Sequence, residues 1–111
     1  MNTKQQIGKI GEDLATKYLN SSGYKILERN YRGKQGEIDI IATEKNQIIF
    51  VEVKARTNLK YGRPVDAVTK TKQAHIEQTA QYYVCKNKLE NKQIRFDVVE
   101  VYIIAGKYKV K

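Results

Sequence analysis

The sequence predicts an α/β fold, in which helices flank a mixed central β-sheet. Apolar residues recur at helical spacing in two segments, 3–20 and 64–86, whereas the segments between and after them alternate with the period of two that strands show. Three consecutive strands joined by short turns favour antiparallel pairing, and the long second helix then permits a parallel crossover. The expected order is helix, three strands, helix and one strand, with a short final strand possible.

Length and composition restrict the classes of protein that fit. A chain of 111 residues is large enough for one core, so one domain is expected over residues 1–111. No apolar run approaches the roughly 20 residues that span a bilayer, and the single cysteine, Cys85, suits a reducing cytosol. A cytoplasmic protein without membrane contact is therefore expected. The net charge of +9 favours a polyanionic partner, nucleic acid before acidic membrane, with simple solubility as the alternative.

The first helix is expected over residues 3–20, where Thr3 and Gln6 have the spacing of a capping box. Glu12 lies at the border of its apolar stripe, near the small residues Gly8 and Ala15. It either approaches the sheet there or is a solvent-exposed glutamate, and the pattern leaves both readings open. The stripe consists of Ile7, Ile10, Leu14, Tyr18 and Leu19.

A strand over residues 24–31 and a basic hairpin loop at residues 32–36 precede two central strands, which extend from Gly36 to Lys54. Alternation places Glu37, Asp39 and Ile41 on one face of the first central strand, and Ile38, Ile40 and Ala42 on the other. In the second, Ile48, Phe50, Glu52 and Lys54 share a face. If a turn at residues 43–47 pairs the two strands, Asp39 and Glu52 come close together.

The second helix is expected over residues 64–86, with Pro64 and Asp66 in its first turn. Its predicted buried face includes Lys72, which either snorkels into solvent or points at the strand acids. A strand over residues 95–104 and a short return strand over residues 108–110 complete the chain. The apolar residues that mark this predicted face are Val65, Val68, Ile76, Ala80 and Tyr83.

Two carboxylates within apolar strands are unfavourable unless a cation compensates them. A divalent metal would do so, and one histidine with no cysteine–histidine pairs at zinc spacing favours oxygen ligands, hence Mg²⁺ or Mn²⁺. Asp39, Glu52 and the backbone carbonyl of Val53 are the candidate ligands, and Lys54 would act on the attacking water or the transition state. The alternative is a structural ion pair of Lys54 with either acid. His75 and Cys85 are interpreted as a surface residue and a helix-end residue.

The spacing of an acid-bearing strand, Gly36-Glu37-Ile38-Asp39, thirteen residues before Glu52-Val53-Lys54 resembles the PD-(D/E)XK nuclease signature. More closely, the chain resembles the YraN family of small predicted endonucleases, which are similar to archaeal Holliday junction resolvases. The other matching segments, which with these cover about residues 8–97, are Gly8-x-x-Gly11-Glu12-x-x-Ala15, Asn30-Tyr31-Arg32, Phe50-Val51, Lys54-x-Arg56, Lys72-Gln73 and Arg95-Phe96-Asp97.

The resemblance implies a restriction-endonuclease-like fold with a metal site at Glu12, Asp39 and Glu52 and with Lys54 as the catalytic lysine. It implies a Mg²⁺- or Mn²⁺-dependent endonuclease acting on DNA, branched DNA included, and by analogy with resolvases a homodimer. A nucleic-acid-binding module that keeps the fold without cleavage is the alternative function. The expected DNA contacts are Arg32, Lys34, Arg56, Lys60, Arg63, Lys72 and Gln73.

Overall fold

The computed structural model describes residues 3–57, 70–104 and 107–110. Its five strands form one sheet in the order β1-β2-β3-β4-β5, antiparallel except for the parallel pair β3–β4. This confirms the predicted α/β class, the mixed sheet and the element order, short final strand included. The elements are α1 (Lys4–Ser21), β1 (Lys25–Arg32), β2 (Glu37–Glu44), β3 (Gln47–Arg56), α2 (Lys70–Lys86), β4 (Gln93–Ile104) and β5 (Lys107–Val110).

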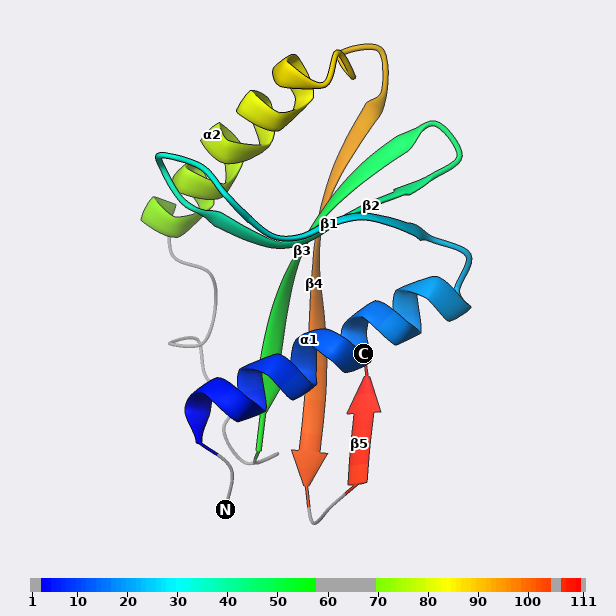
Figure 1. Cartoon of the computed structure of the whole chain (residues 1–111), viewed down its shortest axis with the longest axis vertical. Helices are drawn as coiled ribbons and strands as arrows, with labels where there is room; N and C mark the ends of the chain where they lie inside the picture. The colour runs from blue at the N-terminus through cyan, green and yellow to red at the C-terminus, as the bar shows by residue number, and fades with distance from the viewer. Residues whose placement is uncertain (1–2, 58–69, 105–106, 111) are drawn as a thin grey trace.

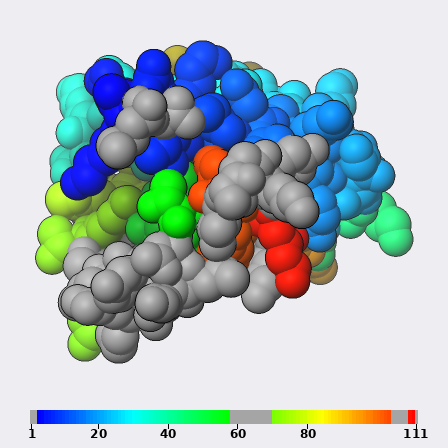
Figure 2. Space-filling model, turned by 90° about the horizontal axis from the view of Figure 1, so that it is seen from below, coloured from blue at the N-terminus to red at the C-terminus, as the bar shows by residue number. Residues whose placement is uncertain are grey.

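The two helices cover opposite faces of the sheet. Figure 1 shows α1 crossing the lower halves of β3 and β4, while α2 lies beside the upper part of the sheet. Because side chains alternate along β3, Ile49 and Val51 pack in the cluster under α1, whereas Ile48 and Phe50 pack in the cluster under α2. Seen from below (Figure 2), the ends of β3 in green, β4 in orange and β5 in red reach the surface beside α1 in blue.

Helix α1 begins as predicted, because the Thr3 side chain accepts a hydrogen bond from the Gln6 amide and the Gln6 side chain accepts one from the Thr3 amide. Its buried residues are Gly11, Ala15 and Leu19, which are spaced four apart along one line. Tyr18, predicted on the apolar stripe, is instead 45% exposed. The small residues bring the helix axis close to the sheet, so the contact line is narrow and Tyr18 falls beside it.

The predicted alternation of β2 is wrong at Asp39. Ile38 packs with Ile41 under α2, whereas Ile40 packs under α1, so two isoleucines two residues apart lie on opposite faces. Asn30, which lies opposite Asp39 between the flanking β1–β2 pairs, has a left-handed φ of 52°. This backbone irregularity interrupts the period of two, and sequence alternation alone gives no sign of it.

Strand pairing between β2 and β3 extends from Glu44–Gln47 to Ile40–Val51. Before Ile40, β2 keeps its pairing with β1 as far as Glu37. The β1–β2 hairpin thus separates from β3 near the middle of the sheet, and Figure 1 shows the hairpin and β3 diverging there. Asp39 lies at the point of separation.

Helix α2 ends at Lys86, as predicted, and buries Ala80 and Tyr83 of its predicted face. The expected first turns, with Pro64, Val65, Asp66 and Val68, lie outside the described residues, as do Lys60 and Arg63. Among the described helices, none combines the length and apolar character needed to cross a bilayer.

Candidate active site

The Asp39 carboxylate bridges the separation between β2 and β3. Its Oδ2 atom accepts a hydrogen bond of 2.8 Å from the backbone amide of Val53. In a continuing antiparallel ladder that amide would donate to a backbone carbonyl of β2. The side chain of Asp39 therefore takes the place of a main-chain acceptor, and this fixes its carboxylate beside Val53 and the neighbouring Glu52.

Glu52 is held between the sheet and α2. Its side chain is only 11% exposed, and its Oε1 atom lies 3.0 Å from Nζ of Lys72. Of the two interpretations of Lys72 left open by the sequence, the structure shows the one in which the ammonium points at the strand acids. Because Lys72 itself is 47% exposed, it reaches the carboxylate from the solvent side of the cleft.

The environment of Asp39 opposes its ionised form. The pKa of Asp39 is raised to about 7, chiefly by burial; the charge and side-chain hydrogen bond of Glu52 and the charge of Glu12 also raise this pKa, whereas the hydrogen bond from the Val53 amide lowers it. Glu52 and Glu12 therefore both act on Asp39. A cation at this position would be favoured because it removes a repulsion that is built into the fold.

Glu12 reaches this region through the close packing of α1 on β3. A Cβ atom on Gly11 would lie 2.8 Å from the Cβ of Ala55, so only glycine permits this approach. The Glu12 side chain is 21% exposed and lies 3.8 Å from the Arg29 guanidinium. It lines a cleft with Gly8 and Arg29 rather than the cleft lined by Asp39 and Glu52. The two clefts are neighbouring, since the charge of Glu12 acts on Asp39.

A cleft of about 330 Å³ contains the Asp39–Glu52 pair, between the start of β2 and α2. His75 lines this cleft with Lys72, although it was interpreted only as a surface residue. It is exposed, as predicted, but its position three residues after Lys72 places both on one helix face. That spacing was the signal that could have identified it. A Cβ on Gly36 would lie 3.1 Å from the Cβ of His75, so the glycine lets α2 approach β2.

Lys54 follows Glu52 by two residues on β3 and is half-buried. In the described part of the chain it has no ion-pair partner, unlike Lys72. Arg56, expected among the DNA contacts, lies 2.7 Å from Oε2 of Glu100 and is only 15% exposed. The structure therefore gives Arg56 an intramolecular partner on β4, and Lys54 lies two residues along β3 from Glu52.

Residues 11–101 match the profile of the Uncharacterised protein family UPF0102. This chain belongs to the UPF0102 family. It is 54% identical over 104 residues to a UPF0102 protein of Clostridioides difficile, covering 94% of this chain and 90% of the relative. A UPF0102 protein of Caldicellulosiruptor saccharolyticus is 52% identical over 100 residues, and these cover 90% of this chain and 85% of the relative.

The UPF0102 match includes all four predicted catalytic residues, because Glu12, Asp39, Glu52 and Lys54 fall within residues 11–101. Within the described ranges, the structure contains no group of three or more His, Cys, Asp or Glu side chains placed to hold a metal ion. Glu12 and Glu52 each have a basic neighbour instead, Arg29 and Lys72. Two carboxylates with water molecules are nevertheless a common way to hold Mg²⁺.

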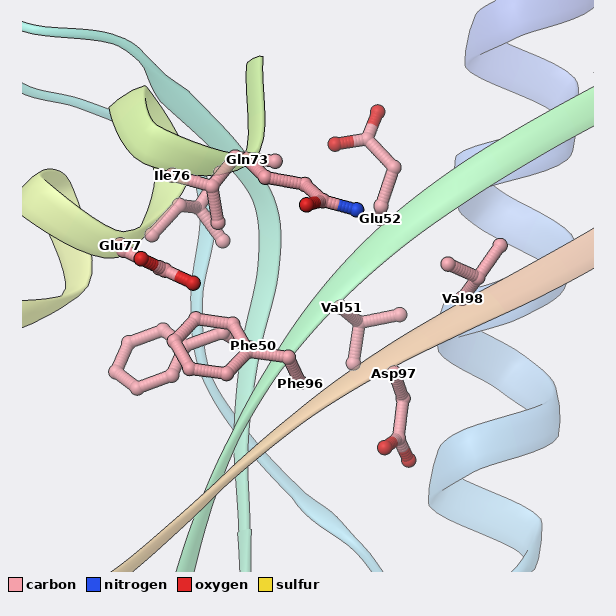
Figure 3. A pocket seen from close by; sticks show the side chains of 10 residues that line it. Phe50, Val51, Glu52, Gln73, Ile76, Glu77, Phe96, Asp97 and Val98 are labelled. Carbon is pink, nitrogen blue, oxygen red and sulfur yellow. The ribbon is translucent and has the colours of Figure 1, made fainter. Parts of the chain in front are cut away.

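Basic residues of the UPF0102 chain gather between the β1–β2 loop and α2. Arg32, with a side chain 79% exposed, and Lys34 line a groove with Lys86, whose ammonium lies 5.8 Å from the Tyr82 ring centre. Gln73 lies at a second groove, and Figure 3 shows its amide directed toward Glu52. Of the predicted contacts, Lys72 lines the acidic cleft itself, Gln73 lines a groove that includes Glu52, and Arg32 and Lys34 line the groove along α2.

Proposed function

We propose that this UPF0102 protein is a metal-dependent endonuclease that hydrolyses phosphodiester bonds of DNA, with branched or otherwise structured DNA as its substrate class. The single observation that carries the proposal is the Asp39–Glu52 carboxyl pair, held by the Val53 amide where the sheet opens. Lys54 on the same strand completes the spacing of the PD-(D/E)XK nuclease signature.

The donor set suits Mg²⁺ or Mn²⁺. Asp39 and Glu52 offer hard carboxylate oxygens, the carbonyl of Val53 is adjacent in sequence, and the charge of Glu12 acts on Asp39 from the neighbouring cleft. When bound, such an ion activates water and neutralises charge on the phosphate. The raised pKa of Asp39 supports this assignment, because a cation beside this half-buried carboxylate would offset the effects of burial and of the Glu52 charge.

The residues of the chain then take separate parts in the reaction. Lys54, which has no ion-pair partner among the described residues, would orient the attacking water or stabilise charge on the phosphate. Lys72 neutralises Glu52 in the free protein. When Glu52 binds a metal ion instead, Lys72 would contact phosphate. The exposed cations Arg32 and Lys34 would hold the DNA backbone on the α2 side, and their effect should fall with rising salt.

A cleavage assay tests the proposal. Labelled linear duplexes, single strands, flaps and four-way junctions would be incubated with the protein and Mn²⁺, Mg²⁺ or a chelator. We expect metal-dependent cuts by the wild type and none by Asp39→Asn or Lys54→Ala, with DNA binding retained. Lys25→Ala is the matched control, since this exposed lysine lies at the start of β1 and lines none of the clefts around the acids.

The second candidate is a nucleic-acid-binding module without cleavage. It is favoured by one specific observation, the ion pair between Lys72 and Glu52, which occupies a predicted metal ligand. Salt-dependent DNA binding without cuts on any substrate would support this candidate and exclude the nuclease. Absence of DNA binding at physiological salt would contradict both, because the basic groove beside α2 would then have another role.

A further inference from the structure

Strand β4 has an open edge over its first half. On one side it pairs with β3 from Gln93 to Tyr102, whereas β5 pairs with it only from Val101 onward. In the part of the chain that the structure describes, the other side of residues 93–100 has no strand neighbour. Unpaired main-chain donors and acceptors of such an edge can accept a further strand.

This edge also carries exposed apolar side chains. Ile94, Phe96 and Val98 are 44%, 48% and 53% exposed, and they are three of the five large apolar side chains that are exposed among the described residues. They alternate along β4 on the α2 side, where the Phe96 ring stacks on Phe50 at 5.4 Å. Figure 3 shows Val98 and Asp97 pointing to opposite sides of the strand. Edge strands of β-sheets usually carry charged side chains that discourage pairing with another strand. At positions 94, 96 and 98, the α2 side of the β4 edge carries none.

The chemistry of the edge is self-complementary about Phe96. Reading outward from that residue, Arg95 mirrors Asp97, Ile94 mirrors Val98, and Lys92 mirrors Glu100. If two copies of the strand are antiparallel with Phe96 opposite Phe96, the pairs 95/97 and 92/100 become pairs of opposite charge and the pair 94/98 is apolar, whereas Gln93 faces Val99. Such pairs stabilise a sheet, and like charges directly opposite each other destabilise it.

From this pattern we propose that the protein forms a symmetric dimer in which the β4 edges of two copies pair antiparallel, centred on Phe96. The two neighbouring registers are disfavoured, because one sets Arg95 opposite Arg95 and the other sets Asp97 opposite Asp97. The two-fold axis is perpendicular to the sheet, so the same patch serves both copies. The resemblance to resolvases implies a homodimer but does not identify its interface. The edge of β4 is the interface that we propose.

The dimer has a consequence for the candidate active sites. Glu52 is in register with Val98, one strand from the edge. Pairing of two β4 strands forms one continuous sheet and places both acidic clefts on the same side, with the two β3 strands separated by three strand spacings of about 4.8 Å each. The pairing itself does not depend on the proposed nuclease function, and its tests use no DNA.

Disulfide cross-linking tests the register directly. In a Cys85→Ser background, the double variant Ile94→Cys with Val98→Cys should form a covalent dimer on mild oxidation, because position 94 faces position 98 of the second copy. Neither single variant should form a covalent dimer. Its two cysteines, one from each copy, would lie four residues apart along the strands, farther than the Cα–Cα distance of about 7 Å that a disulfide can bridge. Equal cross-linking of singles and double, or none, would contradict the proposed register.

Sedimentation over a concentration series provides the independent test. We expect the wild type to form a dimer. Ile94→Lys should raise the dissociation constant of the dimer roughly tenfold, because the substitution occurs twice across the two-fold axis, and adding Val98→Glu should restore the wild-type dissociation constant, because the introduced carboxylate then faces the introduced ammonium of the other copy. Tyr82→Lys, at an aromatic residue 57% exposed on α2, is the control and should leave the dimer unchanged. A wild-type monomer at all concentrations, or a dimer indifferent to Ile94→Lys, would overturn the proposal.

Discussion

Replacing Asp39 by asparagine should stabilise the free protein above neutral pH. Asparagine keeps an oxygen that accepts the hydrogen bond from the Val53 amide, and it removes the negative charge that burial and Glu52 oppose. The pKa of Asp39 is raised in the folded protein, so over the affected pH range the folded state binds more protons than the unfolded state. Stability of the wild type therefore falls as pH rises through this range.

The size of the effect follows from the two pKa values. The pKa of Asp39 rises from 3.8 to about 7 on folding. At 1.36 kcal/mol per pKa unit this sets an upper bound of about 4 kcal/mol. Because the carboxylate is only half-buried, solvent screening reduces the expected stabilisation to about 1–2 kcal/mol. It should be complete above pH 7, decline between pH 7 and 3.8, and be absent below that.

Denaturant unfolding at pH 4 and at pH 8, without divalent metal, measures this difference. The control is Glu37→Gln, two residues earlier on β2, whose exposed carboxylate lies 3.4 Å from Arg32. We expect Asp39→Asn to raise the free energy of unfolding at pH 8 only, and Glu37→Gln to have a small effect at both. A variant that is destabilised at pH 8, or a gain that is equal at both pH values, would refute this description of the site.

Three further predictions concern packing, the Arg95 network and the basic groove. Gly11→Ala should destabilise the protein by about 1–3 kcal/mol in thermal unfolding, because its Cβ would lie 2.8 Å from that of Ala55, whereas Gly8→Ala, with no atom within 4 Å, should be neutral or stabilising. Arg95→Lys should cost about 1–2 kcal/mol in denaturant unfolding, because the guanidinium donates to Asp97, Gln47 and Tyr24 at once; no loss would show that these contacts are dispensable. Arg32→Ala should lower the slope of log K against log salt for DNA binding by about 1, and an unchanged slope would remove Arg32 from the interface.

Much of the fold was predictable because the signals were local. The Thr3–Gln6 cap, the glycine-containing hairpin loop and the alternation of β3 each fix an element without reference to the rest of the chain. The proximity of Asp39 and Glu52 also followed from the sequence, because a short turn between two strands determines which residues face each other.

The remaining features depend on contacts distant in sequence. The opening of the sheet at Asp39 requires a side chain to replace a main-chain acceptor, and alternation predicted the wrong faces there. Arg56 looked available for DNA, but its partner Glu100 lies 44 residues away on β4. His75 reaches the cleft only because α2 packs close to Gly36. The open edge of β4 likewise depends on where β5 begins to pair.

Direct measurement of Mn²⁺ binding by titration calorimetry at pH 8 tests the central claim, that Asp39 and Glu52 form a divalent cation site. We predict one site per chain in the wild type, with affinity that increases as pH rises through about 7, because the carboxyl pair must lose its proton to bind. Glu52→Gln and Asp39→Asn should each weaken binding at least about tenfold, in the range found when metal-site residues are altered. Binding of Mn²⁺ with wild-type affinity by both variants, or no binding by the wild type, would contradict the claim.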